Sequence, residues 1–148
     1  MKLRQPTKFC VGATIDLSRG LGAEVALTGR KVEAGAEFFL AQPTFDAQMS
    51  QRLFDGYARE YGEDLAAPVF HGVQIMSVDG VRFADIPTWV TDDLDAGRSG
   101  DDIALQAVRE YVDAGFTNLY IIPPILRGGR RDYDAAARVM AAAREGLG

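Results

Sequence analysis

One pattern occurs twice in this sequence, and it limits the folds that the chain can adopt. In each copy a helical stretch ends at a glycine, a short apolar segment follows, and a proline closes the segment. The first copy has Gly35, residues 38–41 and Pro43, and the second has Gly115, residues 119–122 and Pro123. Glycine commonly ends a helix, and a short apolar run between turn residues is typical of a buried strand. The glycines are 115 − 35 = 80 residues apart, which predicts two copies of a (βα)₂ unit.

Two more strands and four helices complete the expected order of elements. Apolar runs rich in strand formers predict strands over residues 9–15 and 69–75, in addition to the two strands of the repeat. Apolar residues at helical spacing predict helices over residues 23–34, 45–61, 103–114 and 132–144. Residues 76–98 form a less regular connection, within which residues 86–90 fit a short helix or a turn. Strands that alternate with helices predict a parallel sheet with right-handed crossovers.

This element order leaves two α/β architectures open. Four βα units in 148 residues are half the content of a (βα)₈ barrel, which usually has about 250 residues. Four parallel strands cannot close a barrel, so a (βα)₄ half-barrel needs another chain or a second copy to complete it. The alternative is a small flavodoxin-like open sheet covered by helices. We expect the half-barrel, as a single domain over residues 1–148, because the chain is too short for two ordinary domains.

Composition excludes several classes of function. The net charge of -5 has the wrong sign for a surface that binds nucleic acid or anionic lipid, so neither is expected as a partner. The single cysteine, Cys10, has no second thiol for a disulfide or a metal knuckle. No apolar run approaches the ~20 residues of a membrane span. From these features we predict a cytoplasmic protein without a metal site.

The end of the second expected strand is the first place to look for chemistry. Gln42 follows the apolar residues 38–41 directly, and Pro43 then turns the chain. In a parallel α/β fold the strands are buried on both faces, and ligands gather at their carboxyl ends. Gln42 is therefore the leading candidate for a functional residue. The alternative is that its side chain only caps a loop backbone.

Three stretches of residues resemble one known family. Residues 9–13 read Phe-Cys-Val-Gly-Ala, residues 31–38 read Lys-Val-Glu-Ala-Gly-Ala-Glu-Phe, and residues 41–46 read Ala-Gln-Pro-Thr-Phe-Asp. Together they resemble the second half of methylenetetrahydrofolate reductase, a (βα)₈ barrel that contains FMN. The resemblance covers nearly the whole chain but only strands five to eight of that barrel. It implies a half that needs a complementary half-barrel, or a homo-oligomer, to form a complete site.

The resemblance also implies roles for individual residues. Gln42 matches the family's glutamine that hydrogen-bonds the pterin of the folate, and an amide suits a pterin edge. Lys31 matches a lysine that holds the FMN phosphate or ribityl chain, and Glu24 matches an acid beside the same chain. Tyr120 matches an aromatic residue near the substrate, and Phe45 is a further substrate-binding candidate from the glutamine motif. Lys31 and Glu24 are equally compatible with an ordinary solvated helix face, and Tyr120 with a core tyrosine.

The departures from the family concern catalysis. The family's catalytic glutamate, and the aspartate near its flavin, come from strands that this chain does not contain. The only histidine, His71, stands where proline is common, and it fits either a general base or a core residue. The last strand ends in Pro123 and Pro124 and lacks the family's folate-binding arginine, which Arg127 replaces only if its loop bends back.

These observations leave two hypotheses for function. In the first, the chain is a subunit or fragment of a reductase. Completed by the other half-barrel, it passes a hydride from NAD(P)H through FMN to 5,10-methylenetetrahydrofolate, forming 5-methyltetrahydrofolate. In the second, it is a non-catalytic half-barrel that binds folate or acts as a scaffold for a partner.

Overall fold

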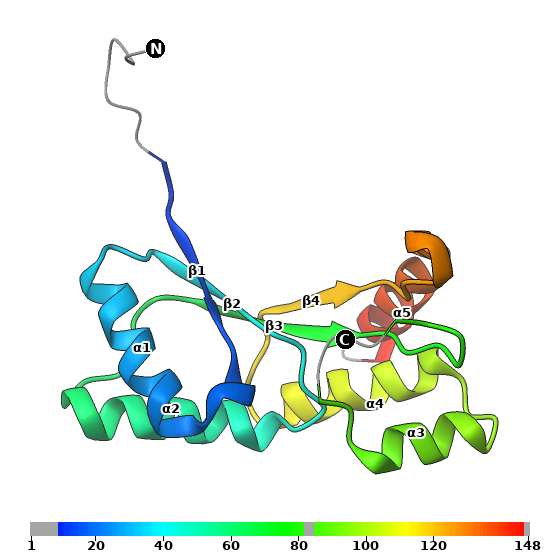
Figure 1. The fold of residues 1–148 in the computed structure, drawn as a ribbon, viewed down its shortest axis with the longest axis horizontal. Helices are drawn as coiled ribbons and strands as arrows, with labels where there is room; N and C mark the ends of the chain where they lie inside the picture. Colours follow the sequence, from blue (N-terminus) through cyan, green and yellow to red (C-terminus); the bar gives the residue numbers. More distant parts are fainter. Residues whose placement is uncertain (1–8, 82–84, 147–148) are drawn as a thin grey trace, which may run out of the picture.

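The computed structural model describes residues 9–81 and 85–146 as four parallel strands that alternate with helices (Figure 1). In chain order the elements are β1 (Gly12–Ile15), the 3₁₀ turn η1 (Leu17–Arg19), α1 (Leu21–Glu33), β2 (Phe38–Ala41), α2 (Ala47–Tyr61), β3 (Val69–Gln74), α3 (Thr88–Asp95), α4 (Gly100–Asp113), β4 (Leu119–Ile122), the 3₁₀ turn η2 (Arg127–Gly129) and α5 (Tyr133–Gly146). All four sequence-predicted strands are present. The irregular connection after β3 contains the short helix α3.

The order of the strands distinguishes between the two expected architectures. The sheet runs β1-β2-β3-β4, and each neighbouring pair is parallel. A flavodoxin-like sheet places its first strand between later ones and carries helices on both faces. Consecutive order with helices on one face belongs instead to a segment of a (βα)₈ barrel. The predicted α/β half-barrel is therefore confirmed.

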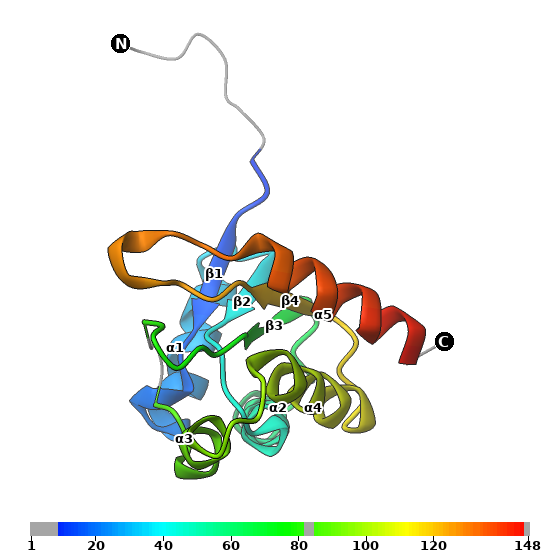
Figure 2. The same cartoon turned by 90° about the vertical axis from the view of Figure 1, so that its right-hand side faces the viewer.

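The pairing register assigns the strand residues to two faces. Ile15 pairs with Ala41, and Ala41 pairs with His71, so these three side chains share one face. All three are buried, and Ile15 and Ala41 belong to a core cluster that includes Val25 of α1. Both views show α1, α2, α3 and α4 on the same side of the strands (Figures 1 and 2). We call this face of the sheet the helix face.

No helix of the described residues covers the opposite face of the sheet, and we call it the open face. Gly12 pairs with Phe38, and Leu40 with Phe70, which puts these residues on the open face. Leu40 is 40% exposed although it lies in a central strand. In a closed barrel this face would be the interior, which is filled by layers of side chains. The open face therefore has the composition of a barrel interior without the second half that would enclose it.

Local signals fix the ends of the helices. Asp46 accepts a hydrogen bond from the backbone N–H of Gln48 at 2.9 Å and caps α2. Ser99 accepts one from the N–H of Asp102 at 3.1 Å and caps α4. Gly62 ends α2 in the left-handed conformation, with φ of 74°. These local interactions set where α2 and α4 begin and where α2 ends.

The predicted first strand is longer than the observed one. Its expected span is residues 9–15, whereas β1 begins at Gly12, where the regular register with β2 starts. At Val11 the backbone N–H instead donates to the side chain of Glu37. Cys10 lies in the lead-in to β1 and is exposed. Within residues 9–81 and 85–146, no helix combines the length and the apolar character needed to cross a bilayer.

Candidate functional site

The carboxyl end of β2 and the strand β4 bring two predicted site residues to the open face. Gln42 follows Ala41, whose side chain lies on the helix face, so strand alternation directs the exposed Gln42 side chain to the open face. The hydroxyl of Tyr120, from β4, donates a hydrogen bond to the carbonyl of Ala41 at 2.9 Å. Tyr120 thus reaches across β3 to the residue directly before Gln42. The sequence-predicted pair is adjacent in the fold.

Gly72 makes this approach possible. It is the β3 partner of Tyr120 in the sheet register. A Cβ atom at Gly72 would lie 2.8 Å from the Tyr120 hydroxyl and ring, and 3.1 Å from the Ala41 carbonyl. Burial raises the pKa of Tyr120, so its phenol stays neutral and keeps the proton that it donates. The glycine and the tyrosine form a fixed wall beside Gln42.

Aromatic side chains fill the amino-terminal half of the open face. Phe38 and Phe70 meet edge to face with ring centroids 6.4 Å apart. The Phe38 ring also lies over Gly12, where an added Cβ would come within 2.7 Å of three ring atoms. The rings close this end of the face. A ligand on the open face would therefore have to lie toward the carboxyl end, on the side of Gln42 and Tyr120.

Two residues of the open face were not predicted from the sequence. Thr14 and Leu40 form a register pair on the open face, and both side chains are exposed. Leu40 stands two positions before Gln42, so counting back along the strand by twos would have identified it. An exposed leucine beside an amide offers an apolar contact for the flat face of a ring whose edge the amide binds.

Phe45 lies elsewhere. Its side chain is 5% exposed and packs edge to face on Trp89 of α3, with ring centroids 6.1 Å apart. It belongs to the core cluster that contains Val73, a helix-face residue of β3. The structure does not bring its ring together with Gln42 and Tyr120. Its substrate-binding role stays a prediction from the motif alone.

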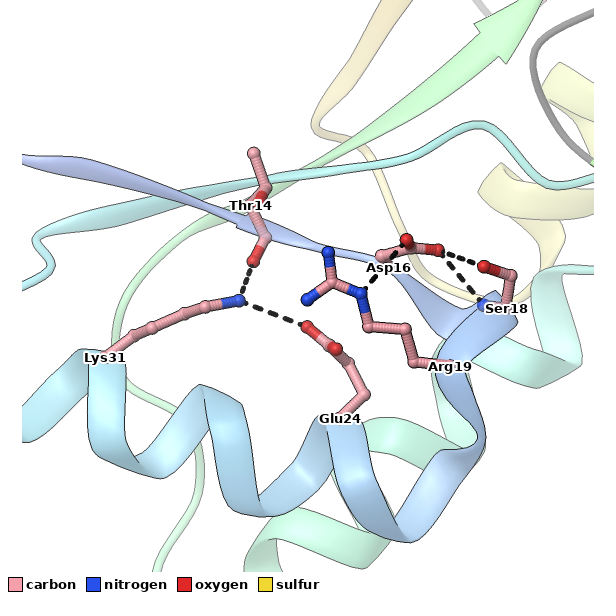
Figure 3. Close-up of polar contacts among 6 residues, drawn as sticks. All are labelled: Thr14, Asp16, Ser18, Arg19, Glu24 and Lys31. Carbon is pink, nitrogen blue, oxygen red and sulfur yellow. Dashed lines mark hydrogen bonds and ion pairs between the residues drawn. The ribbon is translucent and has the colours of Figure 1, made fainter.

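Lys31 and Glu24 are brought together on the inner side of α1. The Lys31 amino group lies 3.2 Å from the Glu24 carboxylate and also donates to the carbonyl of Thr14 (Figure 3). The Glu24 side chain is 0% exposed and the Lys31 side chain 21%. Val11 and Ile15 direct their carbonyls to β2, so the Thr14 carbonyl points to the free edge of the sheet. Lys31 therefore covers part of an unpaired strand edge, as lysines on edge strands often do.

The neighbouring loop carries a second charged group. The carboxylate of Asp16 accepts a hydrogen bond from the Ser18 hydroxyl at 2.6 Å, lies 3.3 Å from the Arg19 guanidinium and caps η1 (Figure 3). The Ser18 hydrogen bond, more than the nearby Arg19 charge, lowers the pKa of Asp16. One carboxylate oxygen of Glu24 is buried and has no hydrogen-bond partner among the described residues. The β1–α1 junction thus concentrates charge, but the junction lies at the edge of the sheet and not on its open face.

His71 belongs to the core. Its side chain lies on the helix face at 2% exposure, and its ring centroid is 5.0 Å from that of Tyr111 and 4.7 Å from that of Phe116. Burial lowers its pKa to about 4, so the ring is neutral at neutral pH. Its Nδ1 lies 3.2 Å from the Ser50 hydroxyl. Of the two interpretations of this histidine, the geometry favours the core residue.

Comparisons with known proteins support the fold and leave the family open. No family model matches the chain, and no curated protein matches it. Among the solved structures that match, one covers 86% of this chain with a TM-score of 0.64 and 13% sequence identity. It is described as an uncharacterized protein from Clostridium thermocellum that binds two copies of 5-methyl-5,6,7,8-tetrahydrofolic acid. This chain spans 51% of that protein, about half its length, and at this identity the match establishes a shared fold.

Proposed function

We propose that this chain binds a reduced folate of the 5-methyltetrahydrofolate class at the carboxyl end of its open face. The observation that carries the proposal is the hydrogen bond of Tyr120 to the Ala41 carbonyl, which fixes an aromatic wall next to the exposed amide of Gln42. An amide both donates and accepts, as the edge of a pterin requires. The binding of 5-methyltetrahydrofolate by a protein of the same fold supports this ligand class.

Different residues of the chain contact different parts of the ligand. Gln42 hydrogen-bonds the pterin edge, while Leu40 and the Tyr120 ring contact its faces. The rings of Phe38 and Phe70 prevent the ligand from sliding toward the amino-terminal end of the strands. A second (βα)₄ half covers the open face and encloses the ligand, because a half-barrel buries only one side of its site.

Binding of 5-methyltetrahydrofolate to the purified chain, measured by calorimetry, tests the proposal. We expect Gln42→Ala to weaken binding about tenfold, the effect of losing about 1.4 kcal/mol of hydrogen bonding. Gln48→Ala is the matched control, since Gln48 is an exposed glutamine on α2 outside the open face. Absence of binding by the unaltered chain, or equal affinities for the two variants, would refute the proposal.

A second candidate function is the reductase activity itself, with FMN held near α1. The contact between Lys31 and Glu24 favours it, because the family resemblance assigns both residues to the flavin chain. The fit is partial. Lys31 has one of its three N–H donors left, and Glu24 offers no exposed oxygen. When bound, FMN would carry the hydride, and the catalytic acid would come from a half that this chain does not contain.

The absorbance spectrum of the purified chain tests this second candidate separately. A flavin spectrum that disappears in Lys31→Ala would support it, and Arg30→Ala on the same helix is the control. A colourless chain, both alone and with its complementary half, would remove the reductase function while leaving folate binding intact.

A further inference from the structure

An apolar groove opens along the free edge of β4. Its volume is about 700 Å³, and three consecutive residues of β4, Leu119, Tyr120 and Ile121, contribute to its lining. Consecutive strand residues point to alternate faces, so a groove that touches all three follows the edge of the strand. Val108 and Val112 of α4 also line the groove, as do Met140, Ala143 and the one charged residue, Arg144, of α5. The last turns of α5 extend beyond the strands on the right-hand side of Figure 2.

The backbone of β4 leaves this edge ready to pair. The carbonyls of Asn118 and Ile122 accept hydrogen bonds from β3. Because hydrogen-bonding direction alternates along a strand, the N–H and C=O groups of Leu119 and Ile121 point away from β3, toward the groove. A strand that paired here would lie beneath the overhanging end of α5. In a (βα)₈ barrel that position belongs to the next strand of the cylinder.

The other edge of the same sheet carries apolar side chains that suit this groove. Phe9 is 73% exposed and Val11 is 50% exposed, and both precede Gly12, the first residue of β1. Figure 1 shows this lead-in stretch running beyond the ends of the other strands. Val11 lies four residues before Ile15, so strand alternation puts its side chain on the helix face as well. The Gly12 backbone points to the free edge, because Val11 and Ile15 direct their carbonyls to β2.

We propose that a second copy of this chain fills the groove, with its β1 pairing in parallel with β4 and its Phe9 and Val11 side chains under α5. Parallel pairing puts the amino-terminal ends of the two strands side by side, and this is the end of β4 to which Leu119 and the last turns of α5 belong. The inference deepens the proposed function and rests on its half-barrel, since it names the partner that encloses the folate site.

Twofold symmetry makes the arrangement closed. Each copy offers one β1 edge and one β4 edge, so two copies form two identical seams and an eight-stranded barrel. The completed barrel has twice the length of this chain, and this chain covers 51% of the folate-binding structure that shares its fold. Each copy contributes one Gln42 to the shared interior, so the dimer has two equivalent candidate folate sites.

Lys31 limits the proposed pairing with β4 of the second copy to the start of β1. Its amino group holds the Thr14 carbonyl, so the later part of the β1 edge is already covered. The earlier part has the exposed, apolar Val11 side chain and the backbone of Gly12, which points to the free edge. The seam therefore combines a short stretch of strand pairing with the burial of Phe9 and Val11.

The mass of the purified chain by light scattering, from about 1 to 100 μM, tests the inference. We expect a dimer for the unaltered chain. Met140→Glu and Val11→Lys, both at partly exposed positions, should each convert it to a folded monomer. Tyr133→Glu, at a 69% exposed position at the start of α5, is the matched control and should leave the dimer intact. A mixture of the two monomeric variants should dimerise again, because each seam then has either the original residues or an opposite-charge pair.

Each outcome supports or refutes a second copy as the occupant of the groove. A monomeric unaltered chain at 100 μM would refute the second copy as the occupant. A dimer that survives both substitutions, or variants that do not recombine, would place the interface elsewhere. If a monomeric chain binds folate, the proposed function stands and the dimer inference fails. If the chain is a dimer that Met140→Glu and Val11→Lys dissociate, but it binds no folate, the dimer inference stands and the proposed function fails.

Discussion

The only histidine of the chain predicts how stability depends on pH. His71 is enclosed by the rings of Phe54, Tyr111 and Phe116, and desolvation lowers its pKa from the ordinary 6.5 to about 4. The unfolded chain therefore takes up a proton at a higher pH than the folded chain does. The stability that His71 contributes is complete above pH 6.5 and is lost as pH falls from 6.5 toward 4.

The size of the effect follows from the shift in pKa. A difference of about 2.5 units, at 1.36 kcal/mol per unit, sets a ceiling of roughly 3 kcal/mol on the loss. At pH 5 the folded ring is still mostly neutral while the unfolded ring is charged, so about 2 kcal/mol is lost relative to pH 7.5. With a denaturant slope of about 1 to 3 kcal/mol/M, the urea midpoint should fall by about 1 M.

Urea unfolding at pH 7.5, 6 and 5, at one fixed protein concentration, measures this loss. His71→Phe keeps an aromatic ring in the pocket and removes the titrating group, so its midpoint should be nearly constant over this range; His71→Gln serves if the first variant does not fold. Asp16 adds nothing to the loss of stability between pH 7.5 and 5, because its pKa lies below the ordinary value of 3.8 and its carboxylate stays charged over this range. A pH-independent midpoint in the unaltered chain, or an undiminished slope in the variant, would refute the desolvation argument.

Two further substitutions test the fold around the site. Gly72→Ala should displace the Tyr120 ring, break its hydrogen bond to Ala41 and lower the free energy of unfolding by about 1 to 2 kcal/mol. Gly22→Ala, which has no atom within 4 Å of the added Cβ, is its control, and equal midpoints for the two would contradict the steric reasoning. Asp46→Ala should cost about 1 kcal/mol by removing the cap of α2. Asp46→Asn should recover most of that loss in the same urea titration, and an Asn variant as unstable as the Ala variant would argue against the capping role.

The repeat in the sequence was sufficient to predict the order and type of the elements. A glycine that ends a helix and a strand that ends at proline are local signals, and both copies occur where expected, at Gly35 and Gly115. The position of Gln42 at a strand end follows from the same local pattern. Its exposure on the open face follows from strand alternation, because Ala41 is buried against the helices.

The remaining features depend on contacts between distant segments. Whether Tyr120 was a core or a site residue could not be decided from its own strand, since the answer depends on Gly72 of β3 and the carbonyl of Ala41 of β2. The motif that contains Gln42 also contains Phe45, yet the chain turns at Pro43 and puts the phenylalanine on Trp89 in the core. Residues that are adjacent in a motif can thus lie on different sides of a sheet.

The open face explains why this sequence contains apolar residues without internal contacts. A self-sufficient open sheet would cover both faces with its own helices, whereas here α1, α2 and α4 pack on a single face. Leu40 on the open face, Val11 at one edge and Met140 at the other are each at least 40% exposed, and each lies where a second half would cover it. If the second copy supplies that half, the surfaces that enclose the folate and the surfaces that join the copies are continuous. Folate should then raise the thermal midpoint of the dimer more than that of Met140→Glu, because only the dimer encloses the ligand.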